Sequence, residues 1–209
     1  MQSINNVLFQ LEYRFAKRLP SSTKYHLAFL PEKSIKWFIN PKGGPTFLTP
    51  EMTKYNSFVL PEQHRVCEWN PERSDWYSFA FVRHPVQRFL RCWQSKIFLS
   101  GYFVFNLSSE EAKAMQDLDA FFELTEGKNL FRRDPHFSLK TAKFPPNELS
   151  FAGRLKSFSS DLKRLNSRIG LHINASLPAP NKTEKPSITS KKTSRIEDLH
   201  TTDMNTYGY

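Results

Sequence analysis

The sequence predicts an α/β fold with a central, mainly parallel sheet flanked by helices. The segment 76–82 is an almost unbroken apolar run, which is typical of a strand buried on both faces of a parallel sheet. A helical pattern over 86–99 follows at once, with Pro85 where a helix prefers to begin. Strand-like and helical segments alternate along the rest of the chain, and this alternation indicates parallel strands joined by helices.

The other elements are predicted from apolar periodicity and from residues that begin or end helices. Apolar residues spaced three to four apart indicate helices, and a glycine after the last apolar position of a helix indicates its end. The expected elements are a helix over the first 18 residues, strands over 25–30 and 34–40, a helix or loop after Pro45, a helix over 110–124, a strand over 149–153, and a helix over 158–169 that ends at Gly170.

The composition describes one folded domain, residues 1–209, with a surplus of positive charge. Hydrophobic residues make up 39% of the 209 residues and aromatic residues 14%, which supports a real core. The formal net charge of +10 favours a polyanionic partner. Part of this surplus lies beyond residue 154, where a solvated tail is the alternative explanation. Residues 174–198 are rich in Pro, Ser, Thr and Lys and are predicted to form a mobile loop or tail.

Cysteine usage and hydropathy exclude several classes of protein. The two cysteines, Cys67 and Cys92, have no metal-ligand spacing, so no zinc site is expected. No stretch reaches the ~20 apolar residues of a spanning helix, and the N-terminus lacks the apolar core of a signal peptide. The sequence therefore predicts a soluble, cytoplasmic protein without a membrane span.

Two basic junctions, each directly after a strand-like run, are the strongest functional signal. The first strand runs into a loop in which Lys42 precedes two glycines, and the second runs into Arg83, His84 and Pro85. A helix that opens just after a strand presents free backbone N–H groups to an anion, and a nearby Lys or Arg adds a full charge. Two such junctions, about 40 residues apart, predict a ligand with two separated anionic groups at one sheet edge.

At these junctions the chain resembles the carbohydrate branch (family 2) of the sulfotransferases, which transfer a sulfuryl group from 3′-phosphoadenosine-5′-phosphosulfate (PAPS) to an alcohol. The family's loops read approximately P-K-x-G-x-T-S and F-x-F-V-R-x-P-x-x-R-x-x-S-x-Y. The corresponding stretches here are 41–47 and 79–93. The segments 134–137 and 151–155, Asn181-Lys182 and the stretch 203–209 also look similar to family segments, so the resemblance covers roughly 35–209 and is densest over 76–96.

The resemblance implies a P-loop-like three-layer fold and a PAPS-dependent enzyme whose acceptor is a hydroxyl group, expected on a glycan. It implies that the 5′-phosphosulfate is bound by Pro41, Lys42, Gly43, Gly44, Pro45 and Thr46, and the 3′-phosphate by Arg83. Arg91 either shares the contact with the 3′-phosphate or fills the pocket. Lys42 would also stabilise the departing phosphate, whereas Arg88 is expected to be a structural or surface residue. The family chemistry requires no metal.

A base must accept the proton of the acceptor hydroxyl. His64 is preferred because related enzymes carry a histidine in the segment between the two loops. His136 is the next candidate, and His84 adjoins Arg83.

The eukaryotic relatives in this family make a membrane-associated or Golgi location the alternative to the cytoplasm.

Three departures from the family pattern leave a second function open. Arg91 replaces a phosphate-binding Ser, Lys140 replaces a frequent Gln, and Lys156 replaces a Glu. The alternative is a degenerate, non-catalytic module that binds nucleotide or polyanion. A nucleotide kinase fits poorly because its lysine follows the glycines of the loop, whereas Lys42 precedes both. No standard DNA- or RNA-binding motif is visible, and no nucleic acid partner is expected.

Overall fold

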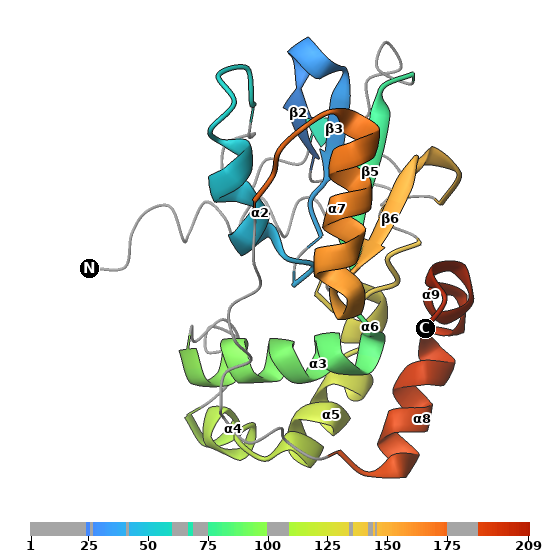
Figure 1. The fold of residues 1–209 in the computed structure, drawn as a ribbon. Helices are drawn as coiled ribbons and strands as arrows, with labels where there is room; N and C mark the ends of the chain where they lie inside the picture. Colours follow the sequence, from blue (N-terminus) through green and yellow to red (C-terminus); the bar gives the residue numbers. More distant parts are fainter. Residues whose placement is uncertain are drawn as a thin grey trace.

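The computed structural model describes residues 24–25, 27–40, 42–59, 67–68, 75–99, 109–133, 136–141, 144, 146–174 and 188–209 (Figure 1). Its elements are β1 (Lys24–Tyr25), β2 (Leu27–Leu30), η1 (Pro31–Lys33), β3 (Ile35–Phe38), α2 (Pro45–Met52), β4 (Cys67–Glu68), β5 (Tyr77–Val82), α3 (Pro85–Trp93), η3 (Gln94–Leu99), α4 (Ser109–Ala114), α5 (Leu118–Gly127), α6 (Leu130–Arg133), η5 (Pro146–Glu148), β6 (Phe151–Arg154), η6 (Leu155–Ser157), α7 (Phe158–Ile169), α8 (Ser190–Leu199) and α9 (Thr201–Tyr207).

The main sheet has four strands in the order β2-β3-β5-β6. Strands β3, β5 and β6 are parallel, with Trp37 opposite Phe79 and Ala80 opposite Ala152. Strand β2 is antiparallel to β3, and β1 and β4 form a separate two-stranded pair. The predicted α/β class with a mainly parallel sheet is confirmed. Because β3 and β5 are parallel neighbours, the two basic junctions that follow them lie at the same edge of the sheet.

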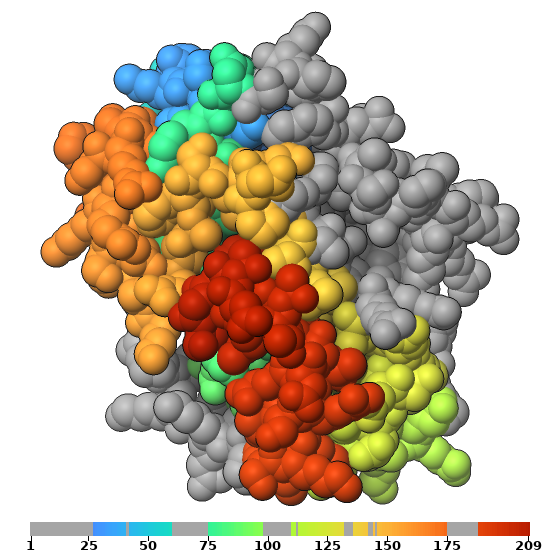
Figure 2. All heavy atoms as spheres, turned by 90° about the vertical axis from the view of Figure 1, so that its right-hand side faces the viewer, coloured from blue at the N-terminus to red at the C-terminus, as the bar shows by residue number. Residues whose placement is uncertain are grey.

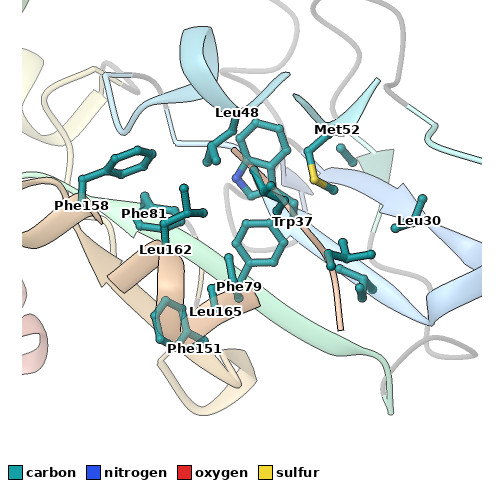
Figure 3. Close-up of a cluster of buried hydrophobic side chains, with 14 of the residues drawn as sticks. Leu30, Trp37, Leu48, Met52, Phe79, Phe81, Phe151, Phe158, Leu162 and Leu165 are labelled. Carbon is teal, nitrogen blue, oxygen red and sulfur yellow. The ribbon is translucent and has the colours of Figure 1, made fainter. Parts of the chain in front are cut away.

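Helices α2 and α7 cover one face of this sheet (Figure 1). Alternate strand residues point into that layer, and Figure 3 shows Trp37, Phe79 and Phe81 beneath side chains from both helices. The Trp37 and Phe79 rings stack with centroids 6.0 Å apart, and Phe81 meets Phe158 of α7 at 5.1 Å. Burial of each such side chain contributes about 1.5–3 kcal/mol, so this core fixes α2 and α7 against the strands.

A second layer of helices, α3, α5, α6 and α8, has its own aromatic core next to the sheet edge (Figure 1). Phe89 of α3 lies at its centre, with ring centroids within 5.3–6.0 Å of those of Phe121, Phe122, Phe131 and Phe137. Since α3 follows β5 directly, this core also fixes the direction in which the second junction leaves the sheet.

Two predicted segments differ from the structure. The single helix expected over 110–124 is two helices, α4 and α5, because the side chain of Asp117 accepts a hydrogen bond from Ala120 N and caps α5. The loop or tail expected over 174–198 is wrong for its last part, which forms α8. Thr189 caps this helix, and Lys192 and Arg195 pair with carboxylates of α5.

Several predicted elements match the structure closely, and two segments lie outside the described residues. Strand β5, the start of α3 at Pro85, and α7 with its end at Gly170 are confirmed. The expected first helix and residues 175–187 lie outside the described residues. In the part of the chain that is described, no helix combines the length and apolar character that crossing a lipid bilayer requires.

Candidate anion-binding site

The first junction is a tight turn pressed against the end of β5. Gly43 N donates to Asn40 O at 2.8 Å, and Asn40 Nδ2 donates to Phe81 O at 2.9 Å. A Cβ on Gly43 would lie 2.4 Å from Phe81 O, so only glycine fits. Gly44 has φ of 94° and precedes α2, and Pro45 opens that helix. Because Gly43 N is already used, the backbone donors that face outward are expected from Gly44 and Thr46.

Lys42 joins the two junctions. Its backbone adopts a left-handed conformation, with φ of 64°, which is strained for a residue with a side chain. Its carbonyl accepts a hydrogen bond from Arg83 Nε at 3.0 Å, and its ammonium group donates to Ser95 Oγ at 2.6 Å. The strained turn therefore places a lysine from the end of β3 directly beside an arginine from the end of β5.

His84 opens the second junction and caps α3. Its Nδ1 accepts a hydrogen bond from Val86 N at 3.3 Å, and its Nε2 lies 3.7 Å from Glu197 Oε1. Burial lowers the pKa of His84, and Glu197 opposes that shift. His84 therefore caps the start of α3 through Nδ1, and its Nε2 faces the carboxylate of Glu197.

Four cations gather at this edge of the sheet: Lys42, Arg83, Arg91 and Lys96. Burial lowers the pKa of Lys42; Cys92 opposes the shift, and Lys96 and Arg83 add to it. Burial and Arg91 likewise lower the pKa of Arg83, with Tyr209 in opposition. Among the described residues no carboxylate acts on either side chain. The cations destabilise one another, and a bound anion would relieve that repulsion.

The end of the chain forms a wall of this site. Arg154 Nη1, at the end of β6, donates to Gly208 O at 2.8 Å, and the His84 and Tyr209 rings meet with centroids 5.3 Å apart. Figure 2 shows α9 packed against the β6–α7 segment. The buried Tyr209 hydroxyl has no hydrogen-bond partner in the described structure, and burial raises its pKa. Polar groups from 197–209 therefore border the second junction.

A buried ion pair fixes the wall. Arg88, expected to be a structural or surface residue, is fully buried. Its Nη2 donates to Phe137 O at 3.0 Å and Ser138 O at 3.1 Å, and its Nη1 lies 3.6 Å from Asp203 Oδ2. Asp203 also accepts hydrogen bonds from the backbone of Lys140 and Thr141. Arg88 and Asp203 thus tie α3 and α9 to the 137–141 segment.

The structure brings together most of the predicted site residues. Lys42, Gly43, Gly44, Pro45, Arg83 and Arg91 lie at one sheet edge, and Thr46 is exposed in the first turn of α2. His136 is half-buried in the segment that Arg88 holds. Pro41 and His64 lie outside the described residues.

Sequence reasoning missed Ser95 and the C-terminal wall. Ser95 follows Arg91 by four residues, so helical periodicity could have placed both on one face. There the helix widens into the π-helical turn η3, a feature often found at functional sites.

His200 illustrates a buried histidine without room for chemistry. Its Nδ1 lies 2.8 Å from Ile196 O and its Nε2 lies 2.6 Å from Phe137 O. Burial and the nearby Arg88 lower its pKa, although the two carbonyls oppose that shift. Among the described residues, no cluster of three His, Cys, Asp or Glu side chains is placed to hold a metal ion.

No protein-family model, curated protein or solved structure matches the chain.

Proposed function

We propose that the chain is a sulfotransferase with a P-loop-like three-layer fold that moves a sulfuryl group from PAPS to a hydroxyl group of a carbohydrate. The observation that carries this proposal is the 3.0 Å hydrogen bond from Arg83 Nε to Lys42 O. It holds two cations, from two parallel strands, side by side with no described carboxylate acting on them. PAPS carries anionic groups at both its 5′ and 3′ ends, which two adjacent junctions suit.

The 5′-phosphosulfate is assigned to the first junction. Lys42 supplies a full charge, the backbone N–H groups of Gly44 and Thr46 supply donors, and the start of α2 adds partial positive charge. The 3′-phosphate is assigned to Arg83 and Arg91. Arg91 replaces the hydroxyl that the family uses, and a guanidinium can bind two phosphate oxygens at once. Arg91 Nη1 donates to Gln94 Oε1 at 3.2 Å, which leaves its other N–H groups for the ligand.

In the transfer step the acceptor oxygen forms a bond to sulfur while the bond between sulfur and the bridging oxygen of the 5′-phosphate breaks. The electron pair of that bond stays on the bridging oxygen, where Lys42 donates a hydrogen bond. The proton of the acceptor hydroxyl passes to a base. His136 is the described candidate for that base, and His64 is the other. Products are the sulfate ester and adenosine 3′,5′-bisphosphate.

The second candidate function is a non-catalytic module that binds nucleotide or polyanion. The observation that favours it is the 2.6 Å hydrogen bond from Lys42 Nζ to Ser95 Oγ, which already uses one donor of the group that should act on the leaving oxygen. In that case Lys42 and Arg83 bind a ligand but no transfer follows.

Calorimetric titration with adenosine 3′,5′-bisphosphate tests the proposal. Wild type should bind with micromolar affinity, about 8 kcal/mol, and Arg83→Ala should lose that binding. Lys128→Ala removes an exposed cation elsewhere and serves as the matched control. Absence of binding by wild type would refute the sulfotransferase, and it would also refute a module that binds nucleotide. Binding without sulfuryl transfer from PAPS to any of a panel of glycans would favour the module.

A further inference from the structure

The outer face of α7 is strongly basic. Between residues 151 and 173 the chain has five Lys and Arg residues against a single acid, Asp161. Lys156, Lys163, Arg164 and Arg168 are exposed, whereas Asp161 is buried. Figure 1 shows α7 on the outside of the sheet. A notable share of the net charge of +10 therefore lies on one helix and the turn before it.

Two of these cations are held together on one aromatic ring. The guanidinium carbons of Arg164 and Arg168 lie 5.8 Å and 5.6 Å from the centroid of the Phe151 ring. Arg164 also donates to Asp161 Oδ1 at 2.7 Å, but no described carboxylate pairs with Arg168 or Lys163. Like charges fixed side by side repel each other, and a ligand with several negative groups relieves that repulsion.

A hollow of about 480 Å³ lies along the flank of α7. Ser159, Lys163, His172 and Asn174 line it with hydroxyl, ammonium, imidazole and amide groups, above apolar side chains of the core. A second hollow of about 310 Å³ shares Ser159 and reaches Leu155 in η6, just before α7. Leu155 in turn packs against Gly44, since a Cβ on Gly44 would lie 3.2 Å from Leu155 Cδ2. The basic face thus adjoins the first junction.

One nearby acid does not cancel this charge. Glu51 Oε2 accepts a hydrogen bond from Asn174 N at 3.2 Å, but Glu51 Oε1 is paired with Lys54 Nζ at 2.5 Å. The carboxylate and its ammonium partner together add no net charge to the rim of the larger hollow.

We propose that the basic face of α7, defined by Lys156, Lys163, Arg164 and Arg168, and the adjoining hollows form a docking surface for an acidic polysaccharide. Charge complementarity requires a polyanion, and the hydroxyl, amide and imidazole groups of the larger hollow suit sugar hydroxyls. Single-stranded nucleic acid needs exposed aromatic rings for stacking, and membrane insertion needs exposed apolar side chains. Among the described residues the one exposed large hydrophobic side chain is Val59, away from this face.

This surface goes beyond the proposed transfer reaction, because docking of a polymer requires neither PAPS nor turnover. The surface begins beside Gly44 and Leu155, so a chain bound along α7 has one end at the cation cluster of the first junction.

The experiment compares two triple variants that remove the same charge. One carries Lys163→Gln, Arg164→Gln and Arg168→Gln; the control carries Lys113→Gln, Lys128→Gln and Lys191→Gln, which are exposed and lie outside α7. Affinity for size-defined heparin oligosaccharides is measured by calorimetry at several salt concentrations. The α7 variant should bind at least ~10-fold more weakly and with a shallower salt dependence, and the control should change less than ~2-fold.

Three outcomes decide the matter. Equal losses in the two variants would show that net charge alone attracts the polymer and would overturn the proposal. Tighter binding of a duplex DNA of equal charge, lost in the same variant, would replace the polysaccharide by a nucleic acid. Titration of the α7 variant with adenosine 3′,5′-bisphosphate separates the two sites: unchanged nucleotide binding with lost heparin binding supports the docking surface, whatever the fate of the transferase proposal.

Discussion

The ammonium group of Lys42 donates a hydrogen bond to the hydroxyl of Ser95, 2.6 Å away and 53 positions further along the chain. Lys42 belongs to the first junction and Ser95 to η3, which continues the helix of the second junction. The bond fills one of the three donor positions of the lysine. It therefore competes with any anion that Lys42 is to bind.

Replacement of Ser95 by Ala should tighten the binding of adenosine 3′,5′-bisphosphate. Loss of a competing hydrogen bond to a charged group is worth about 1.5 kcal/mol, or roughly 10-fold in affinity. Calorimetric titration of Ser95→Ala measures it, with Ser160→Ala on the surface of α7 as the control. Weaker binding by Ser95→Ala would instead mean that the hydroxyl positions Lys42 for the ligand.

Arg83→Lys should bind adenosine 3′,5′-bisphosphate more weakly than wild type and more tightly than Arg83→Ala. Lysine keeps a positive charge but cannot both donate from a guanidinium Nε to Lys42 O and reach a phosphate with two further N–H groups. A decrease of about 10-fold is expected for the loss of one charge-assisted hydrogen bond. Equal affinities for Arg83→Lys and wild type, measured by the same titration, would refute the proposal that Arg83 both binds Lys42 O and contacts a phosphate.

Gly43→Ala should destabilise the protein by about 3 kcal/mol, since overpacking of a tight site typically costs 1–3 kcal/mol. The new Cβ would lie 2.4 Å from Phe81 O and 2.7 Å from the Asn40 side chain, so the turn or the end of β5 must move. Gly127→Ala is the matched control because nothing lies within 4 Å of its Cβ position. Urea denaturation compares the two, and similar midpoints would contradict the close approach of loop and strand.

Asp203→Ala should cost about 3–5 kcal/mol because it leaves the buried guanidinium of Arg88 without its counter-charge. The double variant Arg88→Met with Asp203→Ala should be less destabilised than the sum of the single variants. A double-mutant cycle by chemical denaturation gives the coupling. Additive effects would show that the 3.6 Å pair contributes no interaction of its own.

The stability that Asp161 contributes at neutral pH should be lost in acid. Burial raises the pKa of its carboxyl group, but hydrogen bonds from Arg154 N, Ser157 and Arg164 outweigh burial and hold the pKa below its usual value. A lowered carboxyl pKa contributes stability that is complete above the unfolded pKa of about 3.9 and is lost as pH falls through the folded pKa. The free energy of unfolding of wild type should therefore approach that of Asp161→Asn below about pH 4. A constant difference across pH 2–7 would contradict this assignment.

The elements predicted best from the sequence are those whose local pattern and tertiary role agree. The apolar run of β5 and the stripe of Leu162 and Leu165 in α7 both end in the core that their periodicity indicates. Helix α8 was missed because its Ser-, Lys- and Thr-rich sequence resembles a linker. Its one fully buried residue is Ile196, and the ion pairs that hold it to α5 are contacts between segments about 70 residues apart. Such pairs leave no local signal.

The candidate site likewise has one part that the sequence predicts and one part that it does not. The glycines and cations of the junctions follow a recognisable loop pattern, so Lys42 and Arg83 could be placed together from the sequence once the strands were expected to be parallel. The left-handed backbone of Lys42, its bond to Ser95 and the wall formed by Glu197 and Tyr209 depend on tertiary packing. No spacing in the sequence encodes them.

The wall at 197–209 sets an order of events during synthesis. The two junctions leave the ribosome more than 100 residues before Gly208 and Tyr209, which contact Arg154 and His84. A nascent chain therefore carries a strongly cationic sheet edge without this wall until residues 197–209 emerge. Contacts of such long sequence separation slow folding, so through this interval anionic polymers of the cell can reach the cluster before its own C-terminal segment does.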